Sequence, residues 1–411
     1  MLHGAFAMSA NPWLTVIGIG EDGISGLGDA AKQAIAGAAH VFGGKRHIAL
    51  AESLISGTAR PWPTPFDTAM TDVVALRGRS VVVLASGDPF LHGVGVTLSR
   101  HVPLNEMRTL PAPSAFSLAA SRLGWALQDV ETVSLHGHAI DLIRPLLHPG
   151  TRIIALTSDA EAPKAIAALL AQAGFGASRL TLLEALGGAQ ERLHTAIADH
   201  FVLENINPLN VLAVEVESNQ QARILALASG LADDLFEHDG QITKREIRAV
   251  TLSSLAPRRG ELLWDIGAGS GSIGIEWMLS HPSLNAIAIE ADAERAARIR
   301  RNASQCGVPG LTLVEGAAPD ALSGLPAPDA IFIGGGGSDD GVMDAAIAAL
   351  RPGGRLVANA VTLQMEAVLL AAHAARGGEL LRLAVSRASP VGSMTGWRSA
   401  MPVTQWAWVK P

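Results

Sequence analysis

The sequence predicts an α/β protein built from more than one domain. Short apolar runs alternate with amphipathic, helix-like stretches along the whole chain, a pattern typical of domains with mostly parallel sheets. The chain has 411 residues, more than one ordinary domain, so we expect two or three compact units. A glycine-rich turn follows one apolar run in the second half of the chain, and it predicts a ligand-binding site there.

The composition limits the classes of function. A hydrophobic content of 48% is ample for buried cores, and no apolar run reaches the roughly 18 to 20 residues of a membrane span. The net charge of −7 and the lack of a basic arm argue against nucleic acid as a partner. The single cysteine, Cys306, excludes an intramolecular disulfide and a cysteine-based zinc cluster. We therefore expect a cytoplasmic protein with neither nucleic acid nor a membrane as its partner.

Four candidate strands fall in the first half of the chain and seven in the second. Those of the first half are Leu14–Ile19, Ser80–Ala85, Arg152–Thr157 and Leu209–Val216. The second half has five candidate strands that are each followed by a helix, near Leu262–Asp265, Ala286–Glu290, Leu311–Glu315, Ala330–Ile333 and Arg355–Ala360. Two further apolar runs, Leu380–Val385 and Val403–Val409, close the chain.

The same pattern predicts the limits of the domains. Residues 1–12 are expected to be a loose N-terminal extension, within which Met8 is an alternative start. The first domain is expected over residues 13–217. The chain then becomes polar and acidic over residues 218–240, which predicts a linker, and a second domain is expected over residues 241–411.

The glycine-rich turn lies between two of the strands of the second half. Asp265 ends the first of these strands, and Gly267, Gly269 and Gly271 then let the backbone turn tightly beneath a ligand. Glu290 ends the next strand, where a carboxylate can accept both hydroxyls of a ribose. The arrangement predicts a nucleotide-type pocket, with a nicotinamide cofactor site or a turn without a ligand as alternatives.

The order of acidic residue and glycines favours a methyl donor over a nicotinamide. The pattern DxGxGxG from Asp265 to Gly271 resembles motif I of the class I S-adenosylmethionine (SAM)-dependent methyltransferases, and Glu290 matches their second acidic position. The resemblance implies a seven-stranded, Rossmann-like sheet whose last strand is inserted antiparallel.

Flanking segments narrow this resemblance to the CbiT branch, over about residues 239–411. They are ITKREIRAV before the glycine-rich strand, and EGAAPDAL and DAIFIGGGG after it. The resemblance implies contacts to SAM from Thr243, Gly267, Ala268, Gly269, Ser270, Gly271, Glu290 and Ala318. Thr243 and Glu246 also form a capping box pattern, which predicts that they cap a helix, and one hydroxyl can do both.

Four glycines, Gly334–Gly337, follow the fourth strand of the second half. Base-modifying methyltransferases carry an Asn or Asp there, followed by Pro-Pro and an aromatic residue that holds a flipped base. That motif is absent. The glycines predict either a wide mouth suited to a broad, flat substrate or a mobile loop.

Two loops of the first half also follow candidate strands. Gly18–Gly23 follows one strand, and Ala85–Pro89 follows another. Gly87 permits a close backbone approach and Asp88 supplies an acceptor, so the second loop could hold a small polar molecule at the edge of the sheet. An Asx turn that starts a helix is an equal alternative.

These loops resemble the tetrapyrrole methylase family. The resembling motifs, which span roughly residues 13–217, are VIGIGEDG, SGDPFLHGVG, PAPSAFSLAASRLG and TLLEALGG, and SLHGH at residues 134–138 indicates the CbiE branch. The family has two α/β lobes with SAM in the cleft between them. The resemblance implies SAM contacts from Gly20, Glu21, Ser86, Gly87, Asp88, Ser114, Ala115, Leu156 and Leu186. Glu21 replaces a proline common in related methylases.

A CbiE-like domain followed by a CbiT-like domain resembles the CobL-type precorrin-6Y C5,15-methyltransferases of cobalamin biosynthesis. That resemblance implies methylation of precorrin-6B at C-5 and C-15, with loss of the C-12 acetate carboxyl to give precorrin-8. The expected cofactor is SAM at two sites, and the expected partner is the precorrin. A SAM-dependent RNA methyltransferase and a non-catalytic SAM sensor are the alternatives.

Few other side chains are assigned a role. The candidate cations for the ring carboxylates of the substrate are Lys244, Arg245, Arg387 and Arg398, and the alternative is that each is a solvated surface charge. His92, His136 and His138 are interpreted as turn or substrate-facing residues rather than metal ligands. No catalytic side chain is predicted, and a homo-oligomer is expected.

Overall fold

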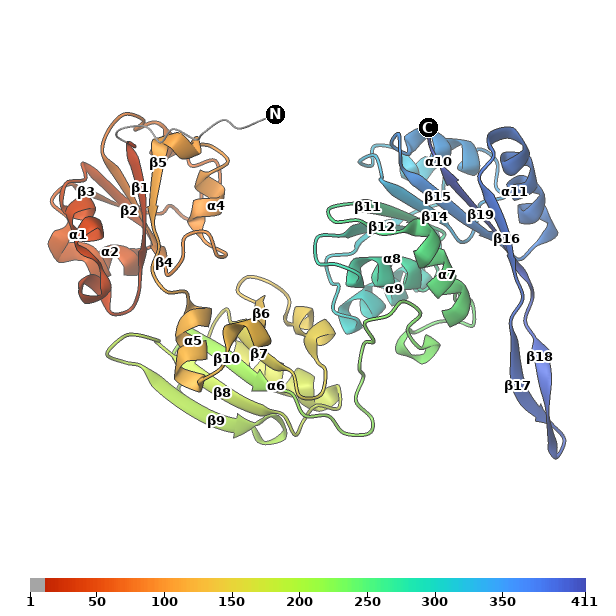
Figure 1. Cartoon of the computed structure of the whole chain (residues 1–411), viewed down its shortest axis with the longest axis horizontal. Helices are drawn as coiled ribbons and strands as arrows, with labels where there is room; N and C mark the ends of the chain where they lie inside the picture. Colours follow the sequence, from red (N-terminus) through yellow and green to blue (C-terminus); the bar gives the residue numbers. More distant parts are fainter. Residues whose placement is uncertain (1–11) are drawn as a thin grey trace. The chain divides into compact units, whose positions relative to one another are not determined.

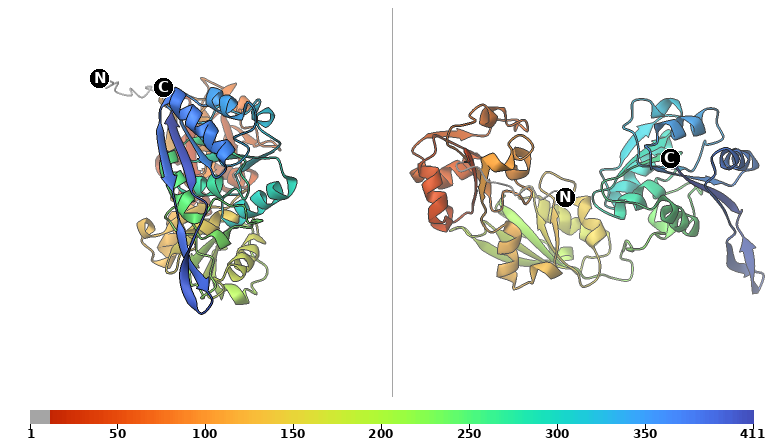
Figure 2. Two further views of the ribbon diagram at one scale, coloured as in Figure 1. Left: turned by 90° about the vertical axis from the view of Figure 1, so that its right-hand side faces the viewer. Right: turned by 45° about the horizontal axis from the view of Figure 1, so that its top comes forward.

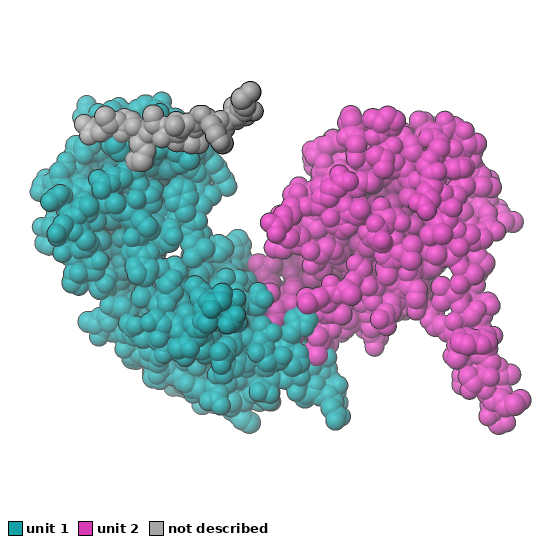
Figure 3. All heavy atoms as spheres, viewed as in Figure 1, with its two compact units in different colours: residues 1–140, 148–222 teal, residues 141–147, 223–411 magenta. Residues whose placement is uncertain are grey.

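The computed structural model describes residues 12–411. Nearly all of the predicted N-terminal extension, including Met8, therefore lies outside the described residues. The chain divides into two compact units, the first of residues 1–140 and 148–222 and the second of residues 141–147 and 223–411 (Figure 3). No helix in residues 12–411 is both long and apolar enough to cross a membrane.

The first lobe of unit 1 is a parallel sheet with the strand order β3-β2-β4-β1-β5 (Figure 1). Its strands are β1 (Leu14–Ile19), β2 (His40–Gly43), β3 (Thr58–Pro61), β4 (Val81–Ser86) and β5 (Met107–Leu110). Its helices are α1 (Asp29–Ala36), α2 (Lys45–Ala51), α3 (Thr71–Val74) and α4 (Val94–Leu98). Neighbouring β1 residues Val16 and Ile17 belong to different buried clusters, so both faces of the sheet are covered.

The second lobe of unit 1 is a mixed sheet with the order β6-β7-β10-β8-β9. Its strands are β6 (Glu131–Ser134), β7 (Arg152–Leu156), β8 (Arg179–Glu184), β9 (Arg192–Ile197) and β10 (Asn210–Glu215), with helices α5 (Ala115–Leu123) and α6 (Ala162–Gln172). Only β6 and β7 pair in parallel, and the other pairs are antiparallel. The α/β class is confirmed, but this lobe departs from the expected parallel pairing because β8 and β9 are joined by too short a connection for a crossover.

Unit 2 is built on a seven-stranded sheet with the order β13-β12-β11-β14-β15-β19-β16. The strands are β11 (Leu262–Ile266), β12 (Asn285–Glu290), β13 (Thr312–Glu315), β14 (Ala330–Ile333), β15 (Arg355–Ala360), β16 (Glu379–Leu383) and β19 (Val403–Val409). The last strand, β19, is antiparallel to both of its neighbours, which confirms the predicted layout.

Helices follow four of the first five strands of this sheet. They are α8 (Ser272–Leu279), α9 (Ala293–Gln305), α10 (Val342–Ala349) and α11 (Leu363–Arg376), and α7 (Arg245–Leu255) precedes the sheet. The helix expected after β13 is instead a short 3-10 turn, Asp320–Leu322. Pro319 directly precedes this turn.

A two-stranded hairpin extends from unit 2 and is not predicted from the sequence (Figure 2). It consists of β17 (Ser386–Val391) and β18 (Met394–Ser399), and it pairs with no other strand among the described residues. Most of its side chains are exposed, including Trp397 at 79%. The apolar alternation that marks a half-buried strand is missing because neither face of the hairpin packs on a core.

The segment expected to be a linker is packed over most of its length. Leu225, Leu231 and Phe236 are buried in a cluster with Ile275 of α8 and with Cys306. Residues 223–240 therefore pack as part of unit 2. The domain limits themselves stay a prediction.

A buried ion pair fastens this segment to two helices. Arg248 of α7 and Glu276 of α8 are 0% and 3% exposed and form a salt bridge. Glu276 also accepts hydrogen bonds from the backbone N–H groups of Gly230 (2.6 Å) and Leu231 (3.0 Å). Arg248 donates to the carbonyl of Leu231 and stacks over the ring of Phe236. Because both charges are desolvated, loss of either partner would leave the other charge buried without a counterion.

We expect a fragment of residues 223–411 to melt at a higher temperature than a fragment of residues 237–411. The shorter fragment loses three buried side chains and both backbone donors to Glu276. Circular dichroism on heating measures the difference. In the longer fragment, Leu231→Ala should lower the melting temperature, while Leu227→Ala should not because Leu227 is 91% exposed. Equal melting of the two fragments would contradict this expectation.

Candidate functional site

The glycine-rich loop of unit 2 follows β11 at the carboxyl edge of the sheet. Gly267, Gly269 and Gly271 all have positive φ angles, of 67°, 61° and 75°. A Cβ atom on Gly267 would lie only 2.4 Å from the carbonyl oxygen of Gly335, in the loop after the neighbouring strand β14. The two loops therefore touch backbone to backbone, and a side chain at Gly267 would force them apart.

Glu290 is joined to this loop through backbone hydrogen bonds. Its Oε2 atom accepts from the N–H of Gly269 at 2.7 Å, and its Oε1 atom accepts from the N–H of Asp292 at 3.0 Å. The carboxyl group is buried at the end of β12. The structure thus brings together the loop and the acidic residue that the sequence predicts as parts of one site.

Asp265 lies beneath the loop with one oxygen satisfied and one not. Oδ2 accepts from the N–H of Gly274 at 2.9 Å, whereas Oδ1 is buried with no partner among the described residues. Burial, followed by the nearby charge of Glu290, raises the pKa of this carboxyl to about 7. Ser270 Oγ is also buried and has no partner in residues 12–411. Both groups retain hydrogen-bonding capacity beneath the loop.

A second backbone-to-backbone contact occurs in unit 1. A Cβ atom on Gly18 of β1 would lie 1.8 Å from the carbonyl oxygen of Gly87, in the loop after β4. Gly87 has a φ of 53° and its carbonyl accepts from the N–H of Ala112 at 3.1 Å. The ends of β1, β4 and β5 thus meet at one edge, where Gly20 and Glu21 continue from β1.

The loop after β4 borders a cavity of about 500 Å³. Asp88 and Ser114 both line it, together with apolar side chains that include Phe116 and Leu127. The Oδ1 atom of Asp88 accepts from the N–H of Phe90 at 2.8 Å, so an Asx turn is present, but it does not start a helix as expected, because α4 begins only at Val94. Ser114 caps α5 by accepting from the N–H of Ser117 at 3.1 Å. Both polar side chains therefore also serve local structure.

Family models match both units. The model described as tetrapyrrole (corrin/porphyrin) methylases matches residues 14–200, and the model described as a precorrin methyltransferase domain matches residues 234–410. A precorrin-6Y C(5,15)-methyltransferase (decarboxylating) from Sinorhizobium sp is 66% identical over 400 residues, which is 97% of each chain. The chain belongs to the precorrin-6Y C(5,15)-methyltransferase (decarboxylating) family.

Two shorter relatives each match less than half of this methyltransferase. A probable cobalt-precorrin-6B C(15)-methyltransferase (decarboxylating) from Pyrobaculum calidifontis is 35% identical and covers 42% of this chain and 92% of its own. A cobalt-precorrin-7 C(5)-methyltransferase from Salmonella typhimurium is 31% identical and covers 44% of this chain and 89% of its own. Membership of a methyltransferase family implies use of SAM, and nothing in these matches supports a nicotinamide site or an RNA substrate.

Two residues of the methyltransferase that the sequence did not single out, Arg46 and His47, surround Ser86. Arg46 forms an ion pair with Glu21 and donates to Ser86 Oγ at 2.9 Å. The Nε2 atom of His47 lies 2.8 Å from the same oxygen. Burial, followed by the charge of Arg46, lowers the pKa of His47 to about 4. The signal in the sequence is a run of basic residues, 45–47, that directly follows an apolar strand.

The other predicted SAM contacts of unit 1 lie in or beside a hydrophobic cluster. Leu186 is 7% exposed and packs with Phe116, and Leu156 and Ala115 pack against the same cluster. Their side chains are thus committed to the core, and a polar contact from them would come from the backbone. The nine contacts in unit 1 stay predictions.

The predicted capping box at Thr243 is wrong. Helix α7 begins at Arg245, its N-cap residue is Lys244, and no side chain caps it. The carbonyl of Thr243 accepts from Arg248, and Glu246 forms an ion pair with Arg387. The box fails because the helix begins one residue later than it requires, and the Glu246 carboxylate is engaged by Arg387.

The remaining predicted residues of unit 2 are spread around its carboxyl edge and the hairpin. Ala318 follows β13 and packs on the main core cluster. Lys244 lies 3.7 Å from Asp233, and Arg245 is exposed. Arg398 pairs across the hairpin with Arg387. The contacts predicted for these residues stay predictions.

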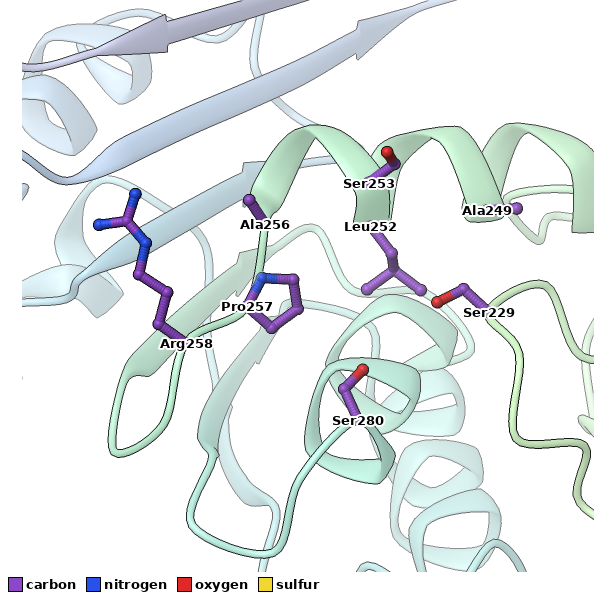
Figure 4. A pocket seen from close by; sticks show the side chains of 8 residues that line it. All are labelled: Ser229, Ala249, Leu252, Ser253, Ala256, Pro257, Arg258 and Ser280. Carbon is purple, nitrogen blue, oxygen red and sulfur yellow. The ribbon is translucent and has the colours of Figure 1, made fainter.

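Two features lie outside these sites. Residues 12–411 contain no cluster of three or more His, Cys, Asp or Glu side chains that could hold a metal ion, and His92 packs near Phe116. A shallow pocket of about 560 Å³ lies between α7, the end of α8 and the loop before β11 (Figure 4). Because that loop leads into the start of β11, this pocket is at the amino edge of the sheet, opposite the glycine-rich loop.

We expect the stability of the methyltransferase to carry a pH dependence from Asp265. Its folded pKa of about 7 lies above the ordinary value of 3.8, so the folded state keeps a proton that the unfolded state releases. The resulting loss of stability grows as pH rises from about 4 to about 7, by at most about 1.4 kcal/mol per pH unit, and is constant above that window.

Urea unfolding of Asp265→Asn across this pH range tests the expectation. The free energy of unfolding of the variant relative to the unmodified protein should rise through the window and then level off. The slope is the diagnostic quantity, because the buried amide adds an offset that does not depend on pH. Asp340→Asn, at an exposed position, is the control and should show no such slope. A flat difference for Asp265→Asn would disprove the assignment.

Proposed function

We propose that this chain methylates precorrin-6B at C-5 and C-15 and removes the C-12 acetate carboxyl to give precorrin-8. The observation that carries this proposal is its 66% identity, over nearly the full length of both chains, to a protein named for methylation at positions 5 and 15 with decarboxylation. The enzyme is a SAM-dependent methyltransferase of cobalamin biosynthesis.

Each unit is proposed to hold its own SAM. Two separate edges support this: β1, β4 and β5 meet through Gly18 and Gly87, and β11 and β14 meet through Gly267 and Gly335. In both places glycines keep the backbone close and leave little side-chain bulk around the backbone N–H groups, and in unit 1 a cavity of about 500 Å³ borders the loop after β4.

The two reactions are proposed to be divided between the units. The shorter relatives support this, because one is named for C-15 methylation with decarboxylation and the other for C-5 methylation. Carbons 12 and 15 flank neighbouring rings of the macrocycle, so one bound pose in unit 2 can present both, whereas C-5 lies on the opposite side. Loss of carbon dioxide leaves an electron-rich system that attacks the methyl group, so the two steps benefit from one shared dry pocket.

The transfer step needs alignment more than a reactive side chain. A nucleophilic ring carbon attacks the methyl group in line with the departing sulfur of SAM, and the carbon then loses a proton or, after decarboxylation, needs to lose none. The chain's contribution is to bind both molecules, exclude water and hold the carboxylates of the substrate. Lys244, Arg245, Arg387 and Arg398 remain proposed partners for those carboxylates.

The homo-oligomer and the cytoplasmic location also remain proposals. The hairpin β17–β18 supports the first, because it exposes Val391, Met394 and Trp397 by 60%, 74% and 79%. Large apolar side chains gathered on a projecting element are typical of contact surfaces between chains.

Titration calorimetry with the full chain and S-adenosylhomocysteine tests the two cofactor sites. We expect two sites per chain. Asp88→Ala should weaken only one and Glu290→Ala only the other, because the two residues lie in different units and Glu290 holds the glycine-rich loop by Gly269. A single site in the unmodified chain would refute the proposal.

Mass spectrometry of products tests the division of labour. The fragment of residues 223–411, given precursor and SAM, should yield a product that has gained one methyl group and lost one carboxyl group. The fragment ending near Glu217 should yield a product that has gained a methyl group only. Loss of the carboxyl group with the N-terminal fragment alone would reverse the assignment.

A further inference from the structure

A second cavity of unit 1, of about 450 Å³, has one cation in its wall. It is bounded by Glu21 and Arg46 of the first lobe and by residues of the segments 185–190 and 207–209 of the second lobe. Among residues 12–411, Arg46 and Glu21 are the only charged residues that line it. The lobes approach closely here, since a Cβ atom on Gly188 would lie 2.8 Å from the Cβ of Glu21.

The guanidinium of Arg46 is held in a fixed orientation. One of its terminal nitrogens pairs with Glu21, and the other donates to Ser86 Oγ at 2.9 Å. The pKa of His47 is lowered to about 4, so its ring is neutral near pH 7 and can accept the Ser86 hydroxyl proton at 2.8 Å. The Ser86 Oγ atom can then accept a hydrogen bond from Arg46. A guanidinium oriented in this way is prepared to bind a planar anion.

Arg46 also retains capacity for a further partner. Its side chain is 39% exposed, while the Glu21 side chain is 19% exposed. A guanidinium has five N–H donors, more than the hydrogen bonds to Glu21, Ser86 and His47 use. The Glu21 carboxylate therefore lies beside the Arg46 guanidinium, where a carboxylate of a ligand could bind next to it or replace it.

We propose that Arg46 binds a carboxylate of a ligand in this cavity, and that Glu21 occupies Arg46 when the ligand is absent. The proposal deepens the proposed function and rests on it. Two ligands of the reaction carry this group: the ring side chains of the precorrin, and the amino-acid portion of SAM. Arg46 is the binding residue, and His47 and Ser86 position it.

The test uses the full chain and the variants Arg46→Gln, Arg46→Lys and Glu21→Gln. The KM for the precorrin in C-5 methylation is measured by mass spectrometry. If the carboxylate belongs to the precorrin, Arg46→Gln should raise this KM by about tenfold or more, because a charge-assisted hydrogen bond is lost. Arg46→Lys should raise it less. Glu21→Gln should lower it, because the competing carboxylate is gone, and misfolding does not produce a gain in affinity.

The second arm measures cofactor affinity by calorimetry. If the carboxylate belongs to SAM, Arg46→Gln should weaken S-adenosylhomocysteine by about tenfold and Glu21→Gln should strengthen it. Methylthioadenosine, which lacks the amino-acid portion, should then bind unchanged. The KM for the precorrin would remain as it was.

The control is Arg100→Ala, an exposed arginine of the same lobe. The proposal would be overturned if Arg46→Gln changed the KM for the precorrin and the affinities for S-adenosylhomocysteine and methylthioadenosine by less than twofold. It would also be overturned if Arg46→Gln weakened all three ligands equally and Glu21→Gln strengthened none of them. C-15 methylation and carboxyl loss should persist in every variant. Absence of C-5 methylation in the unmodified chain would instead count against the proposed function.

Discussion

Both units depend on the same constraint, a close backbone approach at the carboxyl ends of two adjacent parallel strands. In unit 1 the contact joins Gly18 to Gly87, and in unit 2 it joins Gly267 to Gly335. Any Cβ at Gly18 or Gly267 would overlap a carbonyl oxygen, which no rotamer change could relieve. The loops are thereby fixed with little side-chain bulk at the edge of the sheet where α/β proteins bind ligands. The two sheets differ in topology, so the similarity does not come from an internal repeat. It comes from the shared need for an edge of the sheet with little side-chain bulk.

In unit 2 a buried ion pair connects the position of the glycine-rich loop to the packing of the rest of the domain. Helix α8 starts directly after Gly271, so the direction of α8 sets where the glycine-rich loop lies. The pair between Arg248 and Glu276 fixes α8 against α7 and against residues 230–243. Replacing such a pair by apolar residues often costs no stability, whereas removing one member costs about 3–5 kcal/mol. Its contribution is therefore better understood as fixing geometry than as adding stability.

Much of the fold could be predicted because its strands are buried in parallel sheets. Strands such as β1 and β11 are continuous apolar runs bounded by glycine, and their predicted and observed limits agree closely. The strands β2, β3, β5, β6, β8 and β9 of unit 1 and the hairpin strands β17 and β18 were not predicted. For β9, β17 and β18 the reason is that no buried face imposes a pattern on their sequences, whereas β2 and β8 were missed although they are largely buried. The packing of residues 223–240 was also missed, because its few buried apolar residues are spaced among polar ones.

The sites also differ in how much of them could be predicted from the sequence. The glycine-rich loops are local in sequence, so their spacing is visible in it. The group around Ser86 is not local, because Arg46 lies 40 residues from Ser86 and 25 from Glu21. A basic run such as 45–47 is ordinarily interpreted as a solvated surface, and only the fold shows that its histidine is half-buried and its arginine paired.

The loop Gly334–Gly337 has close contacts that bear on the two interpretations of its glycines. Gly335 is held against Gly267, and a Cβ on Gly337 would lie 2.5 Å from Cε of Met365 on α11. Gly337 is buried, whereas Gly334, Gly335 and Gly336 are exposed. A Cβ on Gly334 would also lie 2.8 Å from Cε1 of Phe332. Fixed points only two residues apart leave little freedom for large motion. These contacts argue against a freely mobile loop, because Gly337 is packed against α11 and the backbone of Gly335 lies against Gly267. The wide mouth for a broad, flat substrate stays a prediction.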